Sequence, residues 1–193
     1  MAEITVADIM SAVAYERARP DLRRRVMQLK NRRRVLLGEH ASLHFESRET
    51  MLYQVHEMLR AESSWLRPGA VEGELEAYNP LVPGSGELSA TLMLEWESPA
   101  ERAHWLSALR GLEHHTWLKV DDTEPLPATF DRAQASPTRI SSVQYLRWAL
   151  DDERQRRLAT EGTAVWVILD HPAYASRAVL SEETRRELVT DLE

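Results

Sequence analysis

Apolar and polar side chains alternate in several short segments of the chain, which is the pattern of half-buried β-strands. In residues 41–46, Ala41, Leu43 and Phe45 fall on one face and polar side chains fall on the other. Residues 88–96 alternate in the same way. Strands are therefore predicted over residues 35–37, 41–46, 88–96, 114–120, 142–148 and 165–169.

Other segments carry apolar residues at helical spacing. Leu52, Val55 and Leu59 form such a stripe in residues 48–61. A short helix over residues 6–17 is expected to break at Pro20, because proline removes a backbone donor from the helix interior. Further helices are predicted over residues 21–34, 99–110, 151–159 and 181–192.

Three strand-to-helix junctions resemble one another. Each has a leucine near the strand end (Leu43, Leu94 and Leu146), and these leucines are 51 and 52 residues apart. Such spacing is typical of internal duplication, although any strand-to-helix junction favours the same residue types. Either interpretation predicts an α+β fold, with a mixed sheet built from repeated strand–helix–strand units and helices packed mainly on one face.

The length of 193 residues favours a single domain. Within residues 1–193 we expect an N-terminal helical arm (1–34), a first half (35–120), an acidic connection (121–138) and a second half (139–193).

The chain contains no cysteine, which excludes disulfides, cysteine-held iron–sulfur clusters and thiol nucleophiles. Any metal must be held by His, Asp or Glu. The longest apolar runs are about as long as a strand, far shorter than a membrane-spanning helix. The first residues include acidic side chains, whereas a secretory signal carries positive charge there. We therefore expect a cytoplasmic protein that does not bind membranes.

The net charge of −7 is spread unevenly. Residues 17–34 contain nine Lys or Arg and one acid, a charge of +8, which leaves about −15 on the rest of the chain. Such a basic segment can be solvated, pair with the acidic body or a second copy of the chain, or bind a protein partner. Nucleic acid is not an expected partner, because Tyr15 is the only aromatic residue near the segment for base stacking.

Residues 45–62, which read FESRETMLYQVHEMLRAE, resemble the signature of a bacterial family catalogued as domain of unknown function 3501. Residues 77–81, 90–95 and 170–174 fit the same family pattern. The resemblance implies no particular reaction, but it implies a genomic neighbourhood. Members of the family are often encoded beside rubrerythrin-like proteins and a large iron–sulfur oxidoreductase. It points to redox or peroxide-stress metabolism by association.

The helix over residues 48–61 carries the first candidate site. Glu57 and Tyr53 are candidate catalytic residues, and Thr50, Gln54 and Arg60 accompany them at helical spacing. A carboxylate flanked by such groups can be a buried acid–base group, whereas a Glu57–Arg60 pair can equally be a surface ion pair. Three further candidate polar residues lie in the stretches that resemble the family: Glu62, Asn79 and Glu95.

A second candidate is a metal site. His40, His44 and Glu46 share one strand face, and His56 lies on the helix that follows. Two histidines and a carboxylate are the donors that non-haem iron or manganese uses. The alternative is that these histidines are solvated or hydrogen-bonded.

The third candidate follows the most apolar strand. Asp170 and His171 are candidate catalytic residues, because the carboxylate could orient the imidazole for proton transfer. An Asp before a His-Pro turn is also ordinary turn chemistry.

These observations lead to one principal hypothesis of function and two alternatives. The principal hypothesis is an accessory or interaction protein of a redox system, without a cofactor of its own. The first alternative is a metal-dependent enzyme that uses iron or manganese. The second is a regulator that binds a small ligand between a helix and the sheet.

Overall fold

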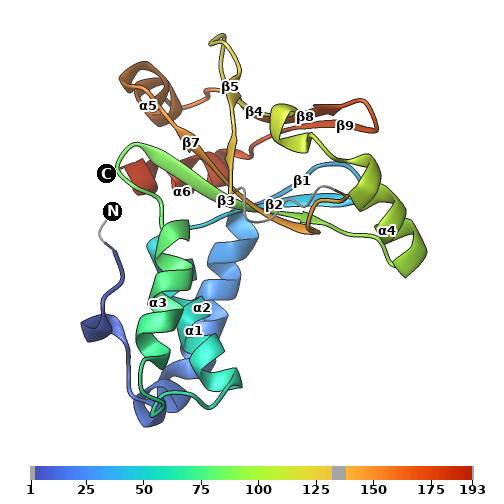
Figure 1. Cartoon of the computed structure of the whole chain (residues 1–193). Helices are drawn as coiled ribbons and strands as arrows, with labels where there is room; N and C mark the ends of the chain where they lie inside the picture. Colours follow the sequence, from blue (N-terminus) through green and yellow to red (C-terminus); the bar gives the residue numbers. More distant parts are fainter. Residues whose placement is uncertain (1–2, 132–137, 193) are drawn as a thin grey trace.

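The computed structural model describes residues 3–131 and 138–192, and shows a bundle of three helices projecting from a body that contains two sheets (Figure 1). The helices are α1 (Ala12–Arg32), α2 (Arg48–Ala61), α3 (Ala70–Tyr78), α4 (Pro99–Ala108), α5 (Asp152–Ala159) and α6 (Glu182–Leu192), with 3-10 turns η1 (Val6–Asp8), η2 (Asn79–Leu81) and η3 (Leu112–His114). The strands are β1 (Arg34–Leu36), β2 (Ala41–Phe45), β3 (Glu87–Leu94), β4 (Thr116–Val120), β5 (Leu126–Pro127), β6 (Thr129–Phe130), β7 (Val143–Ala149), β8 (Val165–His171) and β9 (Tyr174–Val179).

The strands form two sheets. The first sheet has the order β1-β2-β3-β7-β6 and the second has the order β5-β4-β8-β9. The α+β class is confirmed. All strand pairs among the described residues are antiparallel, so the prediction of a mixed sheet is corrected in this detail.

The antiparallel pairing of β2 and β3 follows from a helix that was not predicted, α3. Helices α2 and α3 pack against each other, so the chain leaves β2 and returns to the same end of the first sheet. His44 of β2 then lies opposite Thr91 of β3. The other strand–helix–strand units, β3–α4–β4 and β7–α5–β8, each carry the chain from the first sheet to the second.

Two apolar clusters hold these elements together. The larger joins Leu43 and Leu92 of the first sheet to Leu118 and Val167 of the second, with leucines of α4, α5 and α6 around them. The smaller lies inside the bundle and contains residues of α2 and α3 together with Ile4. The helices are thus divided between the bundle and the main core.

The two faces of β3 differ in polarity, and this difference positions the candidate site. Leu88, Ala90 and Leu92 are buried in the main core. Because side chains alternate along a strand, Ser89 and Thr91 point to the other face, toward the bundle. We call this the polar face of the first sheet.

Helix α1 runs without a break through Pro20, so the predicted end of the first helix is wrong. Ion pairs to α2 hold the helix on both sides of the proline: Arg19 pairs with Glu57 before it, and Arg25 pairs with Glu49 after it. These contacts offset the backbone hydrogen bond that proline cannot make.

The predicted acidic connection over residues 121–138 contains two short strands. β5 pairs with β4 of the second sheet, and β6 pairs with β7 of the first, so residues 126–130 pass from one sheet to the other. Residues 132–137 of the predicted connection lie outside the described residues. Within the part of the chain that the structure describes, no helix is both long enough and apolar enough to cross a membrane.

Candidate functional site

Glu57 of α2 lies in the interface with α1, where three groups donate hydrogen bonds to its carboxylate. Arg19 donates from Nε to Oε1 at 2.7 Å and from Nη2 to Oε2 at 2.8 Å, and the Tyr15 hydroxyl donates to Oε1 at 2.6 Å. The Arg19 guanidinium, with Tyr15, lowers the pKa of Glu57 to about 2. A carboxylate held this firmly in its charged form stabilises the helix pair and is poorly suited to take up a proton near neutral pH.

Two other candidates on α2 are buried beside Glu57. The Tyr53 side chain is 6% exposed, and burial raises the pKa of its hydroxyl. His56 is 2% exposed, with Nδ1 2.8 Å from the carbonyl of Leu52, and its Nε2 accepts the backbone N–H of Met10 at 3.0 Å. Both ring nitrogens of His56 are therefore occupied by backbone groups, and burial lowers the pKa of the imidazole.

The polar face of the first sheet brings two predicted residues together. Glu46 is 7% exposed, and its carboxylate accepts hydrogen bonds from the hydroxyls of Thr50 and Thr91, each at 2.7 Å. Among the described residues no ion pair of this carboxylate is found. Tyr145 of β7 lies opposite Thr91, and burial raises the pKa of its hydroxyl, with Glu46 acting in the same direction.

A cavity of about 950 Å³ opens between the α3–η2 segment and this polar face. Its lining includes Ser89 and Arg147, which are directly opposite each other on β3 and β7, and Tyr145. Ser89 is 1% exposed, and its hydroxyl has no hydrogen-bond partner among the described residues. An unpaired buried hydroxyl costs about 1–3 kcal/mol, so this atom is a candidate contact for a polar group of a ligand.

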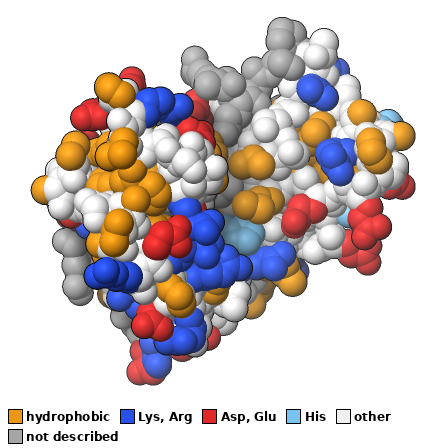
Figure 2. Space-filling model, turned by 90° about the horizontal axis from the view of Figure 1, so that it is seen from below, with side chains coloured by type: hydrophobic (Ala, Val, Ile, Leu, Met, Phe, Trp, Pro, Cys, Tyr) orange, Lys and Arg blue, Asp and Glu red, His pale blue; other side chains and the backbone are white. Residues whose placement is uncertain are grey.

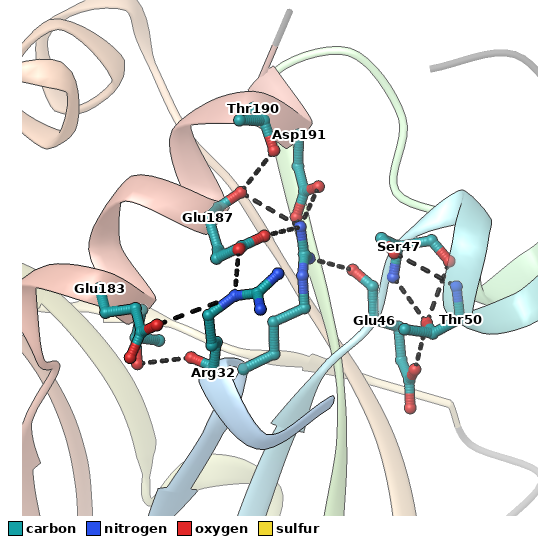
Figure 3. A network of polar contacts seen from close by, with 10 residues as sticks. Arg32, Glu46, Ser47, Thr50, Glu183, Glu187, Thr190 and Asp191 are labelled. Carbon is teal, nitrogen blue, oxygen red and sulfur yellow. Dashed lines mark hydrogen bonds and ion pairs between the residues drawn. The ribbon is translucent and has the colours of Figure 1, made fainter. Parts of the chain in front are cut away.

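A second polar network ties α1 to α6 and to the start of α2 (Figure 3). Arg33 is 3% exposed and donates to both carboxylate oxygens of Asp191, at 2.6 and 2.8 Å. It also donates to the carbonyls of Glu46 and Glu187, and Arg32 donates to the Glu187 carboxylate. Burial raises the pKa of Asp191, and the Arg33 guanidinium acts in the opposite direction. The network fixes the end of α1 against the β2–α2 junction.

Of the other candidate metal ligands, His44 lies on β2 and His40 lies just before it. The hydroxyl of Ser42 lies 3.1 Å from Nε2 of His44 and donates to the Glu95 carboxylate at 3.1 Å. His40 Nδ1 lies 3.1 Å from the Glu95 carbonyl, and the ring stacks on Trp96. Burial lowers the pKa of His44.

No group of three His, Asp or Glu side chains with metal-binding geometry occurs in residues 3–131 and 138–192. His44 and Glu95 flank one hydroxyl, and His56 is held inside the bundle by backbone groups. The metal-dependent reaction stays a prediction of the sequence.

Asp170 orients an imidazole, although not that of His171. Its Oδ1 lies 3.0 Å from Nδ1 of His115 and accepts a hydrogen bond from Nε1 of Trp117 at 3.0 Å. The hydrogen bond from Trp117 has the larger effect on the pKa of Asp170, and both contacts lower it. His171 is 7% exposed and is held by the Arg110 carbonyl and the Ala173 N–H. The pairing within one dipeptide is corrected because neighbouring residues of β8 point to opposite faces.

The remaining candidate polar residues are dispersed. Arg60 pairs with Glu16 of α1 at 2.7 Å instead of with Glu57. Glu62 caps α2 and pairs with Arg67, and Gln54 is half-buried on α2. Asn79 lines the cavity, and its side-chain amide exchanges two hydrogen bonds of 2.9 Å with the backbone of Ile4.

The sequence did not indicate Ser89 or Tyr145 as site residues. Both occupy the polar positions of alternating strands, and that alternation was the available signal. Their convergence depends on the pairing of β3 with β7, which the sequence alone does not specify.

The comparisons with known proteins extend over the whole described chain. Residues 3–192 match the model of a family described as Protein of unknown function (DUF3501). A crystal structure at 1.90 Å of a novel protein of unknown function from Burkholderia pseudomallei is similar, with a TM-score of 0.91 and 34% sequence identity over 100% of each chain. No curated protein matches the chain.

Proposed function

The chain belongs to the DUF3501 family of proteins of unknown function, and we propose that it binds a small ligand in the cavity between the α3–η2 segment and the polar face of the first sheet. Membership confirms the family resemblance seen in the sequence. The observation that carries the proposal is the Ser89 hydroxyl, which is buried at the cavity without a partner among the described residues.

The size and lining of the cavity support a small organic ligand. Its volume of about 950 Å³ lies at the upper end of the range for ligand pockets, roughly 300–1,000 Å³. Leu81, Val82 and Phe130 supply apolar surface, while Ser89 and Tyr145 supply polar groups from adjacent strands. Apolar walls with a few convergent polar groups are typical of such pockets.

Tyr145 lies beside a hydrogen-bonded network of the polar face. Tyr145 stands opposite Thr91, whose hydroxyl is fixed by Glu46, and Glu46 is fixed in turn by Thr50 at the start of α2. A ligand that contacts Tyr145 would therefore meet a network connected to the bundle. This connection gives ligand binding a route to the position of α2, as a regulator requires.

A fragment screen by thermal shift tests the proposal, with Ser89→Ala and Ser42→Ala as matched variants. Both serines are 1% exposed on the first sheet, but the Ser42 hydroxyl contacts His44 and Glu95 and lies outside the cavity lining. Fragments should stabilise the wild type and the Ser42→Ala variant and should lose most of their effect on the Ser89→Ala variant. Fragments that act equally on all three proteins, or a screen without hits, would contradict the proposal.

We also propose a second function, docking of a partner protein, because the bundle has an exposed apolar tip. Leu66 is 97% exposed, Val13 is 64% exposed and Val6 is 55% exposed. Figure 2 shows hydrophobic side chains gathered over the bundle with Lys and Arg side chains beside them. Arg17 and Arg24 of α1 are among the exposed basic residues. A partner with apolar side chains flanked by acids would complement this tip.

The redox proteins that the family resemblance suggests are the first partners to test. Binding of a rubrerythrin-type protein and of an iron–sulfur oxidoreductase from the same genome can be measured by biolayer interferometry at micromolar concentrations. Leu66→Asp should weaken binding at least about tenfold, since a charge would enter an apolar contact. Val179→Asp, at a 50% exposed apolar residue on β9, is the control and should bind as the wild type does. Failure of the wild type to bind either protein contradicts the redox partnership.

A further inference from the structure

Arg147, which lines the cavity, uses only part of its capacity to donate hydrogen bonds. A guanidinium carries five N–H donors. Nη1 of Arg147 donates to Oε2 of Glu87 at 3.1 Å, and the same oxygen accepts the backbone N–H of Gly84 at 3.1 Å. Within residues 3–131 and 138–192, Nε and Nη2 of Arg147 make no hydrogen bond. The edge of the guanidinium that carries these two nitrogens is therefore open to a ligand.

The Ser89 hydroxyl stands beside this guanidinium. Ser89 of β3 and Arg147 of β7 lie directly opposite each other, so their side chains leave the sheet on the same face, with Cβ atoms about 4.5–5.5 Å apart. Ser89 is 1% exposed, and its hydroxyl has no hydrogen-bond partner in the part of the chain that the structure describes. A buried unpaired hydroxyl and a partly used guanidinium, from two different strands, thus meet at one place in the cavity.

Together these two groups favour a ligand atom that accepts hydrogen bonds. The Arg147 guanidinium can only donate, and the Ser89 hydroxyl can donate as well. A carbonyl oxygen has two lone pairs, so it can accept one hydrogen bond from each residue at the same time. A protonated amine has no lone pair for the guanidinium and would bring a second positive charge close to it.

The Glu87 carboxylate decides between a charged and an uncharged acceptor. Glu87 and Arg147 are both half-buried, and their contact matches one negative charge to one positive charge. A carboxylate ligand would place a second negative charge beside the same guanidinium and would be repelled by Glu87. An uncharged carbonyl group uses the open donors of Arg147 without competing for its charge.

We infer that the cavity takes an uncharged carbonyl compound, such as a ketone, an ester or an amide, attached to a compact apolar body. Its carbonyl oxygen accepts hydrogen bonds from the Ser89 hydroxyl and the open edge of the Arg147 guanidinium. The apolar body packs on the side of the cavity formed by Leu81, Val82 and Phe130. This inference rests on the proposed ligand-binding function and adds the chemical class of the ligand.

Calorimetric titration with matched probes tests the inference. Each set places a methyl ketone, a primary amide, a carboxylate or an ammonium group on the same benzyl or cyclohexylmethyl body. The ketone and the amide of a set should bind at least about tenfold more tightly than its carboxylate and its amine, a difference of about 1.4 kcal/mol. Preference for the carboxylate or the amine would overturn the inference.

Three variants locate the effect. Arg147→Met keeps an apolar stem but removes the donors, and it should weaken the ketone and the amide about tenfold. Arg177→Met, at an exposed arginine of β9 outside the lining, is the matched control and should change neither. Glu87→Gln removes the negative charge beside Arg147, so it should strengthen the carboxylate several-fold and leave the ketone nearly unchanged. The melting temperature of each variant checks that it is folded.

The outcomes separate this inference from the proposed function. Ketone and amide binding that is unchanged in Arg147→Met would overturn the carbonyl inference, and so would the absence of binding by every probe. The ligand-binding function would still stand if fragments of another class stabilise the wild type and lose their effect on the Ser89→Ala variant. A fragment screen without hits, together with probes that do not bind, would overturn both.

Discussion

Replacing Glu57 by glutamine removes one negative charge from the α1–α2 interface while keeping the size and shape of the side chain. The wild-type carboxylate accepts two hydrogen bonds from Arg19 and one from Tyr15, which is fully buried. In the variant, Arg19 loses its charged partner, and the Tyr15 hydroxyl must bond to a neutral amide. We expect the folded state to lose about 2 kcal/mol at pH 7.

The magnitude follows from the pKa of Glu57, which falls from an ordinary value of 4.5 to about 2 in the folded protein. Each pKa unit corresponds to about 1.4 kcal/mol, so the folded state favours the charged form by about 3 kcal/mol at most. The Glu57 side chain is 21% exposed, and access of water reduces this figure to about 2 kcal/mol.

The sign of the pH dependence follows from the direction of the shift. Because the pKa is lower in the folded protein than in the unfolded chain, the stabilisation is complete above pH 4.5 and is lost as the pH falls toward 2. Urea unfolding of the wild type and the Glu57→Gln variant, followed by circular dichroism, should give a stability difference that narrows by about 1–2 kcal/mol between pH 7 and pH 3.

Glu49→Gln is the matched control. Glu49 also lies on α2 and pairs with an arginine of α1, Arg25, but both side chains are largely exposed, at 41% and 65%. Its loss should cost less than about 1 kcal/mol. Equal losses at Glu57 and Glu49, or a Glu57→Gln difference that stays constant from pH 7 to pH 3, would refute the reasoning.

Two further predictions concern buried polar groups. Arg33→Ala should destabilise the chain by about 3–5 kcal/mol in urea unfolding, because it leaves the Asp191 carboxylate buried without its partner. Arg24→Ala removes one side of an exposed ion pair and should cost less than about 1 kcal/mol. Equal losses would show that the Arg33 network does not hold α1 to α6. Ser42→Ala should cost about 1 kcal/mol by removing two hydrogen bonds, while Ser89→Ala should leave the melting temperature unchanged or raise it, since the hydroxyl that it removes has no partner. A larger loss at Ser89 than at Ser42 would contradict the assignment of Ser89 as unpaired.

The elements that could be predicted from the sequence are those whose apolar spacing and caps lie within one short segment. The helix predicted over residues 48–61 has the same bounds as α2, because its apolar stripe and the Ser47 cap both lie within a few residues. Strand β9 was not predicted. Its side chains alternate between half-buried and exposed, but the more buried face includes the small residues Ser176 and Ala178, so the apolar alternation is weak. Helix α3 contains Gly73, which weakens a helical pattern, and it forms because its apolar side packs on α2.

The candidate site depends on contacts that are distant in the sequence. Glu46 and Thr50 were singled out separately, one as a metal ligand and one as a polar residue, and a hydrogen bond joins them. Ser89 and Tyr145 meet at the cavity only because β3 and β7 pair in one particular register. Strand order and register come from the packing of the whole chain, so residue types and spacing did not reveal this site.

The central claim is that the Ser89 hydroxyl belongs to a ligand site. The measurement that tests it most directly is a crystal structure of the protein soaked with a fragment that stabilises the wild type in the thermal-shift screen. The account predicts density for the fragment in the cavity, with a polar atom of the fragment within hydrogen-bonding distance of Ser89 Oγ. Density for the fragment elsewhere on the molecule, with Ser89 Oγ bonded instead to another group of the protein, would contradict it.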